Sequence, residues 1–168
     1  MSRGSVSTIS APERAGHTLR VRAAALAESV VTELYRRRPD LETRYGPDGR
    51  RHCVNDLAHH LRFLAASTEL GDAKVFVDYV AWAADVMASR GVDVRDQLDS
   101  LEVLRDVAAA AVPDEIADFV RHTVSAASER AKYASTCPRP RARRSPPSHP
   151  RPAAPPAAST AGSTPARS

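Results

Sequence analysis

The sequence contains few aromatic residues and few cysteines. Its 168 residues include one Trp, four Tyr, three Phe and two Cys, whereas hydrophobic residues of all kinds make up 42%. The core of this chain must therefore consist mainly of Ala, Val and Leu. Cys137 stands at the edge of a Pro-rich segment, where little would hold it in disulfide geometry with Cys53. We therefore expect a reduced, intracellular protein.

Long apolar runs are also absent. No stretch approaches the about 18 consecutive apolar residues of a transmembrane helix. The first residues, MSRGSVSTIS, lack the apolar core of a secretory signal peptide. No alternating strand pattern occurs, and nothing repeats at intervals of about 20–50 residues. We expect a cytoplasmic protein without membrane insertion.

The net charge of +4 is concentrated at the C-terminus. Residues 138–168 hold six arginines, no acidic residue and nine of the thirteen prolines. The remainder of the chain has 18 basic and 20 acidic residues, so a folded nucleic-acid-binding face has little electrostatic support. We expect residues 137–168 to form a disordered Pro/Arg/Ala-rich tail. Such a tail binds nucleic acid, or another acidic partner, at most weakly.

Apolar residues recur at helical spacing through the rest of the chain, and Pro or Gly residues separate the periodic segments. Ser10 and Glu13 form a capping-box signature at the first helix, and Pro39 ends that helix. Residues 40–49 hold at most one short helical turn. We predict a flexible N-terminus over 1–9 and an all-α domain over 10–136. Its about five helices are predicted over 10–38, 50–70, 72–90, 93–112 and 114–134.

The second of these helices carries a polar stripe within HCVNDLAHHLRFL. Cys53, Asp56 and His60 follow one edge of its apolar face at i, i+3 and i+7. Cys53 and His60 are two turns apart, about 10 Å along the axis, so one zinc ion with ligands at about 2.0–2.3 Å does not fit all three. A long, flat ligand such as a tetrapyrrole fits better. Asp56 would accept hydrogen bonds from its N–H groups, and His60 would be an axial ligand if the tetrapyrrole held iron or cobalt. Packing and a surface ion pair are the alternatives for these residues.

The segment CVNDLAHHLRFLAASTELGD, residues 53–72, resembles the chromophore helix of phycobiliproteins. In that helix a bilin-binding Cys opens a C-x-R-D motif, followed by two aromatic residues, Leu-Arg and a terminal Gly-Asp. The matching positions here are Cys53, Asp56, His59-His60, Leu61-Arg62 and Gly71-Asp72. Over 40–112 the chain is similar to phycobilisome-like globins. These include the bilin biosynthesis-associated globins and the helical domains that accompany cobalamin-binding modules in bacterial regulators.

The resemblance implies a globin-like, phycocyanin-like fold that binds a bilin, haem or cobalamin. It places Asp56 and His60 against the ligand and makes Cys53 the attachment point of a bilin. Asn55 departs from the family pattern, because an Arg that pairs with a bilin propionate stands there in phycobiliproteins. The segment before Cys53 is too short for the N-terminal helical hairpin of antenna subunits, which argues against light harvesting.

Four further residues are candidates for the same pocket. Tyr79 and Trp82, three residues apart, are expected to wall it, and Arg62 is expected to pair with a propionate. Tyr45, before the second helix, closes one end of the pocket in this interpretation. Each has a plainer alternative: Tyr79 as a core residue, Trp82 at its boundary, Arg62 in solvent and Tyr45 in a turn.

No grouping of Ser, His, Asp or Cys has the local context of a nucleophile with its base. We therefore expect a non-enzymatic regulatory protein that binds or senses a tetrapyrrole and associates with itself or with a regulatory partner. The alternative is a ligand-free helical interaction module that uses its basic tail as a tether.

Overall fold

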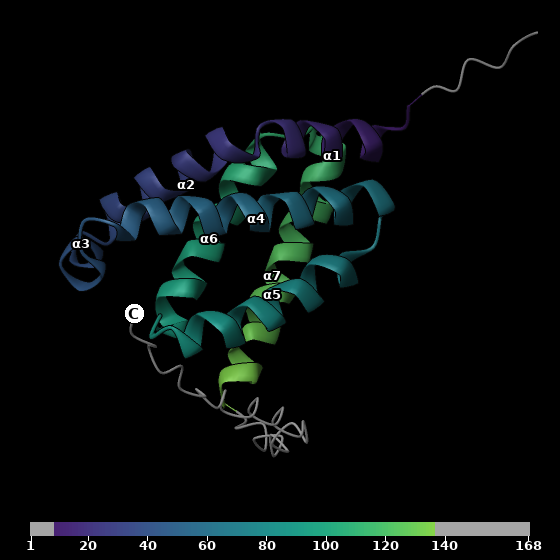
Figure 1. Ribbon diagram of the computed structural model, residues 1–168. Coiled ribbons are helices and arrows are strands. Elements are labelled where there is room, and N and C mark those ends of the chain that lie inside the picture. Colours follow the sequence, from purple (N-terminus) through teal and green to yellow (C-terminus); the bar gives the residue numbers. More distant parts are fainter. Residues whose placement is uncertain (1–8, 137–168) are drawn as a thin grey trace, which may run out of the picture.

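The computed structural model describes residues 9–136, and all of the regular structure in that range is α-helical (Figure 1). The helices are α1 (Ala11–Val21), α2 (Ala23–Arg37), α3 (Asp40–Tyr45), α4 (Gly49–Leu70), α5 (Ala73–Ser89), α6 (Val94–Ala110) and α7 (Asp114–Thr136). The all-α class is thus confirmed, but the expected number of about five helices is wrong for the described residues. The expected flexible N-terminus and disordered tail, with Cys137, lie outside these residues, except for Ile9. Within 9–136, no helix combines the length and the apolar character needed to cross a membrane.

Two local features account for the additional helices. The helix expected over 10–38 is divided at Arg22, whose φ and ψ of −93° and 6° interrupt the helical backbone. No Pro or Gly marks this bend, because it follows the packing: α1 lies against α4, whereas α2 lies against both α4 and α6. The second addition is α3, which extends the expected short turn to six residues and ends before Gly46, at a φ of 67°.

The predicted helix boundaries are confirmed where a capping residue marks them. The Ser10 hydroxyl accepts from the Glu13 backbone N–H at 3.4 Å, and the Glu13 carboxylate accepts from the Ser10 N–H at 2.7 Å. The carboxylates of Asp72 and Asp93 cap α5 and α6, each at 2.8 Å from the backbone nitrogen two residues on. Gly71 ends α4 in the left-handed conformation, with a φ of 63°.

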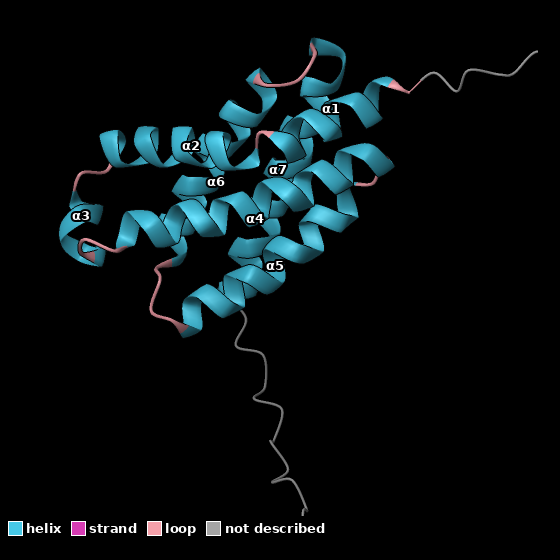
Figure 2. Cartoon of the chain, turned by 45° about the horizontal axis from the view of Figure 1, so that its top comes forward, coloured by secondary structure: helices cyan, strands magenta, loops and turns pink. Residues whose placement is uncertain are grey.

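The helices form two packed groups joined by short loops (Figure 2). In one group α4 runs back alongside α1 and α2 (Figure 1). In the other, α7 packs against both α5 and α6, and α5 and α6 also contact α4 and α2 respectively. The core between them is mostly aliphatic, as the composition predicts, and its largest fully buried side chain is Phe76. This arrangement places the polar edge of α4 beside α5 and α6.

α1 and α4 approach closely at Gly16. A Cβ atom on Gly16 would lie 2.7 Å from the carbonyl oxygen of Ala65 and 2.3 Å from Cγ of Glu69. The Glu69 side chain is flexible, but the Ala65 carbonyl belongs to the α4 backbone and has little room to move. Gly16 therefore allows a backbone contact that fixes how α1 lies on α4, although glycine is itself a poor helix former.

Gly16→Ala is expected to destabilise the fold by about 1–3 kcal/mol, because the clash with α4 outweighs the gain in helix propensity. Urea unfolding followed by circular dichroism measures the change. Ser29→Ala is the matched control, since it lies on an exposed position of α2 and should change the free energy of unfolding by less than about 0.5 kcal/mol. A Gly16→Ala protein as stable as the parent would show that α1 does not need this close approach.

Candidate functional site

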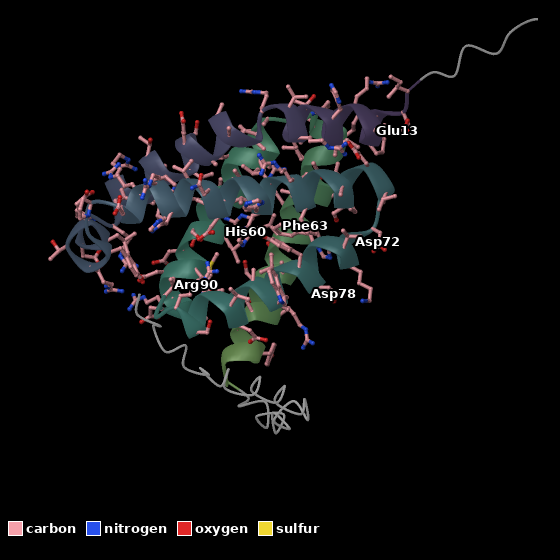
Figure 3. All side chains as sticks on the ribbon, in the orientation of Figure 1. Glu13, His60, Phe63, Asp72, Asp78 and Arg90 are labelled. Atoms are coloured by element: carbon pink, nitrogen blue, oxygen red, sulfur yellow. The ribbon has the colours of Figure 1, made fainter. Side chains whose placement is uncertain are left out.

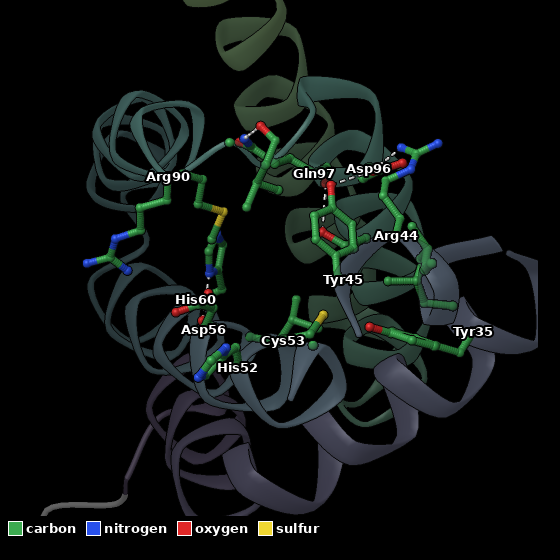
Figure 4. Close-up of a pocket in the computed structure, with 18 residues that line it drawn as sticks. Tyr35, Arg44, Tyr45, His52, Cys53, Asp56, His60, Arg90, Asp96 and Gln97 are labelled. Atoms are coloured by element: carbon green, nitrogen blue, oxygen red, sulfur yellow. Dashed lines mark hydrogen bonds and ion pairs between the residues drawn. The ribbon is translucent and has the colours of Figure 1, made fainter. Parts of the chain in front are cut away.

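A cavity of about 590 Å³ lies beside α4 (Figure 4). Side chains from the five helices α2–α6 line it, as does the loop that joins α5 to α6. The volume lies within the range of about 300–1,000 Å³ that is typical of small-molecule sites. The lining residues that carry most of its chemistry are Tyr35, Arg44, Tyr45, Cys53, Asp56, His60, Arg90 and Asp96.

The polar stripe on α4 faces this cavity. Cys53, Asp56 and His60 all line it, together with His52 and the buried Leu57. The stripe faces the cavity because of how α4 is packed. Leu57 and the leucines that follow it at helical intervals hold one face of α4 in the core, and the stripe lies along the edge of that face. The edge beside that face then meets the gap that α5 and α6 leave.

The other candidates from the sequence lie elsewhere. Asn55 and Arg62 are exposed and are not among the residues that line the cavity. Tyr79 and Trp82, which were expected to wall the pocket, do not line this cavity either. Tyr79 instead stacks on Phe63, with ring centroids 3.8 Å apart and planes 8° from parallel, and Trp82 is 62% exposed. The three aromatic residues form a cluster between α4 and α5 in which Phe63 and Trp82 are exposed and Tyr79 is half-buried, and Figure 3 shows Phe63 next to His60.

The ring of His60 is held in one orientation. Its Nδ1 lies 2.8 Å from the backbone carbonyl oxygen of Asp56, and because a carbonyl can only accept, Nδ1 is the donor. Burial lowers the pKa of His60 below its ordinary value, so the ring is neutral at pH 7. Edge contacts from Phe76 and Tyr79 hold the ring on its other sides. The lone pair of the neutral ring is therefore on Nε2, the atom that a ligand could use.

The thiol of Cys53 is held in its protonated form. Burial raises the pKa of Cys53 to about 12, and the negative charge of Asp56 adds to this shift. A thiol with such a pKa has very little thiolate at neutral pH, and the thiolate is the nucleophile. Cys53 is accordingly suited to a contact with a ligand but not to spontaneous attack on one.

Iodoacetamide at pH 8 is expected to modify Cys53 at least about 100-fold more slowly in the folded Cys137→Ser protein than in urea, because the raised pKa suppresses the thiolate. The rate should rise with pH up to pH 10 without levelling off. Mass spectrometry of quenched samples measures both rates. Equal rates in the folded and unfolded protein would contradict the raised pKa.

The opposite wall of the cavity depends on Asp96, in the first turn of α6. Its carboxylate is 5% exposed and accepts hydrogen bonds from Arg38 at 3.0 Å, Arg44 at 2.6 Å and the Tyr45 hydroxyl at 2.7 Å. The Tyr45 hydroxyl in turn accepts from the backbone N–H of Asp93 at 3.2 Å. This network, which joins the end of α2, α3 and the start of α6, explains why Tyr45 lines the cavity (Figure 4).

Sequence reasoning missed Asp96 and Arg44. Both are charged residues in polar stretches, where the usual expectation is a solvated side chain. The sequence feature that could have indicated Asp96 is its position in the first turn of α6, three residues after the capping residue Asp93. Two acidic residues at the start of a helix form a negatively charged site that can bind an arginine from another segment. Tyr45 was the one member of this wall that the sequence suggested.

Asp96→Asn is expected to destabilise the protein by about 1–3 kcal/mol, because two arginines then lose a buried charged acceptor. Urea unfolding measures the loss. Asp106→Asn is the control, as Asp106 pairs with the adjacent Arg105 on the exposed side of α6 and should have an effect below about 0.5 kcal/mol. Equal stability of the two variants would show that the network around Asp96 does not hold the wall.

The described residues contain no group of three or more His, Cys, Asp or Glu side chains placed to hold a metal ion. The cavity is instead lined by separated single groups: Asp56, His60, Cys53 and, at its rim, Arg90. Such a set can meet an extended organic ligand at several of its atoms.

The sequence matches the family described as phycobilisome protein over residues 4–130, about three quarters of the chain. No curated protein matches it. The matched region includes α1 to α6 and most of α7, and so contains every residue that lines the cavity. The resemblance drawn from the segment after Cys53 is therefore confirmed at the level of the family.

Proposed function

Because this chain belongs to the phycobilisome protein family, we propose that it binds a bilin, a linear tetrapyrrole, in the cavity beside α4. One observation carries the proposal: Cys53, Asp56 and His60, the residues that the resemblance to the chromophore helix singles out, line a single cavity of about 590 Å³. Helical spacing alone places these residues on one edge of a helix. The cavity gives that edge a space of ligand size.

Each residue of the stripe has a proposed role. The Asp56 carboxylate has no hydrogen-bond or ion-pair partner within residues 9–136, and it would accept hydrogen bonds from pyrrole N–H groups. His60 packs against the plane of the ligand or contacts it through Nε2. Cys53 is the residue to which a bilin could become attached. Its raised pKa implies that such an attachment needs help from outside this chain.

The role proposed for the protein is regulatory and non-enzymatic. The thiol of the cavity is protonated, and the imidazole commits Nδ1 to a backbone carbonyl. Neither is arranged as a nucleophile with its base. A difference in free energy between free and bound conformations would carry the signal.

Haem and cobalamin are the competing ligands. For either one His60, which lines the cavity, would supply the axial nitrogen through Nε2, because Nδ1 donates to the Asp56 carbonyl oxygen. The prediction of His60 as a metal ligand applies only to these two cases. The family relationship favours the bilin.

The test is a titration of the purified full-length protein with biliverdin, phycocyanobilin, haem and cobalamin, each followed by absorbance. We expect a spectral shift with a bilin, and we expect Asp56→Ala to weaken the affinity about tenfold through loss of a charge-assisted acceptor. Asp118→Ala is the control, because Asp118 is an exposed carboxylate on α7, outside the cavity. Denaturation of the complex shows whether the bilin is attached, and Cys53→Ser should abolish any attachment.

A second candidate function is a ligand-free helical interaction module. The exposed aromatic residues Phe63 and Trp82, on either side of the half-buried Tyr79, favour it, because aromatic side chains on a surface are enriched in protein interfaces. If none of the four ligands changes its spectrum with the protein, the bilin proposal fails and this second role becomes the better one.

A further inference from the structure

The two arginines that line the cavity differ in their surroundings. Arg44 donates to Asp96 and also pairs with Asp40 at 3.3 Å. Arg90, at the end of α5, lines the same cavity but has no ion pair and no side-chain hydrogen bond within residues 9–136. Many other arginines of the described chain pair with an acid. Arg90 is thus a cationic group that the fold places at a cavity without using its charge.

The backbone at Arg90 is held by the turn that ends α5. The N–H groups of Arg90 and Val92 donate to the Met87 carbonyl oxygen at 3.0 and 3.1 Å, and the N–H of Gly91 donates to Ala88 at 3.1 Å. Gly91 has a φ of 82°, a backbone conformation that residues other than glycine rarely adopt. This closed turn fixes where the Arg90 side chain starts, at the rim of the cavity (Figure 4).

Figure 4 shows Arg90 on the same side of the cavity as Asp56 and His60, with its side chain extending outward at the rim. Asp56 is a carboxylate that can accept from N–H groups, and Arg90 offers several donors in a planar fork that matches a carboxylate. A ligand that satisfies both must carry N–H donors and a carboxylate a short distance away. Asn55, which replaces the arginine of the family pattern, cannot provide the positive charge for that carboxylate.

Given the bilin-binding function proposed above, on which this step rests, we propose that Arg90 binds a carboxylate of the ligand and so selects acidic tetrapyrroles over neutral ones. The cationic group for the carboxylate thus comes from the end of α5 and not from α4. Its position at the rim suits a propionate, since a charged group remains partly in water while the rest of the ligand enters the cavity.

The experiment compares biliverdin with its dimethyl ester, which has the same conjugated system but no carboxylate. Full-length wild-type protein should bind biliverdin about tenfold more tightly than the ester, because a charge-assisted pair is lost with the ester. Arg90→Gln should reduce the affinity for biliverdin to that for the ester and leave the affinity for the ester unchanged. Arg90→Lys, which keeps the charge without the planar fork, should recover part of the difference.

Arg62→Gln is the matched control, because Arg62 is an exposed arginine of α4 near His59 and does not line the cavity. It should preserve the preference for biliverdin. The proposal is overturned if Arg90→Gln weakens both ligands equally, which is a packing effect, if it changes neither affinity, or if Arg62→Gln removes the preference instead. If the wild-type protein binds neither compound, both the bilin-binding function and this role of Arg90 are wrong. Binding of both compounds without a preference is evidence against the role of Arg90 alone.

Discussion

The buried carboxylate of Asp96 is the interaction on which the cavity most depends. It receives Arg38 from the end of α2, and Arg44 and Tyr45 from α3. Leu41 is the buried apolar residue of α3, so the contacts of Arg44 and Tyr45 with Asp96 supply much of what holds this short helix beside α6. A buried charge is favourable only when its partners are complete, as they are here. The wall opposite α4 therefore rests on polar chemistry, whereas the rest of the fold rests on an aliphatic core.

α4 links this wall to the core because it has two functions along its length. Its leucines pack into the core at helical intervals, and Gly16 brings α1 close against its second half. The polar edge of its first half remains for the cavity, where Cys53, Asp56 and His60 lie in a row. The core positions the helix, and the position of the helix determines which side chains a ligand meets. An acidic ligand would then find its counter-charge on α5, at Arg90.

The aromatic residues show why a local pattern is not enough to assign a pocket. Tyr79 and Trp82 have the spacing of a pocket wall, yet they join Phe63 in a cluster at the surface, in which Tyr79 is half-buried. Their spacing determines only that they share a side of α5. The rotation of α5 about its axis decides what that side faces, and this rotation follows from the burial of Phe76 and Val80. A cavity and a surface cluster consequently lie next to each other on the same pair of helices.

The all-α class, the capped helix boundaries, the apolar face of α4 and the stripe of Cys53, Asp56 and His60 all follow from the order of the amino acids alone. Each of these depends on residues within a few turns of one another, and capping and helical periodicity are local physics. The bend at Arg22, the burial of Asp96 and the place of Arg90 at the cavity depend instead on how the helices pack against one another. Arg38 and Asp96 are 58 positions apart, and no local pattern shows that such residues meet. Their contact depends on how whole helices pack, which is settled only when the complete core forms.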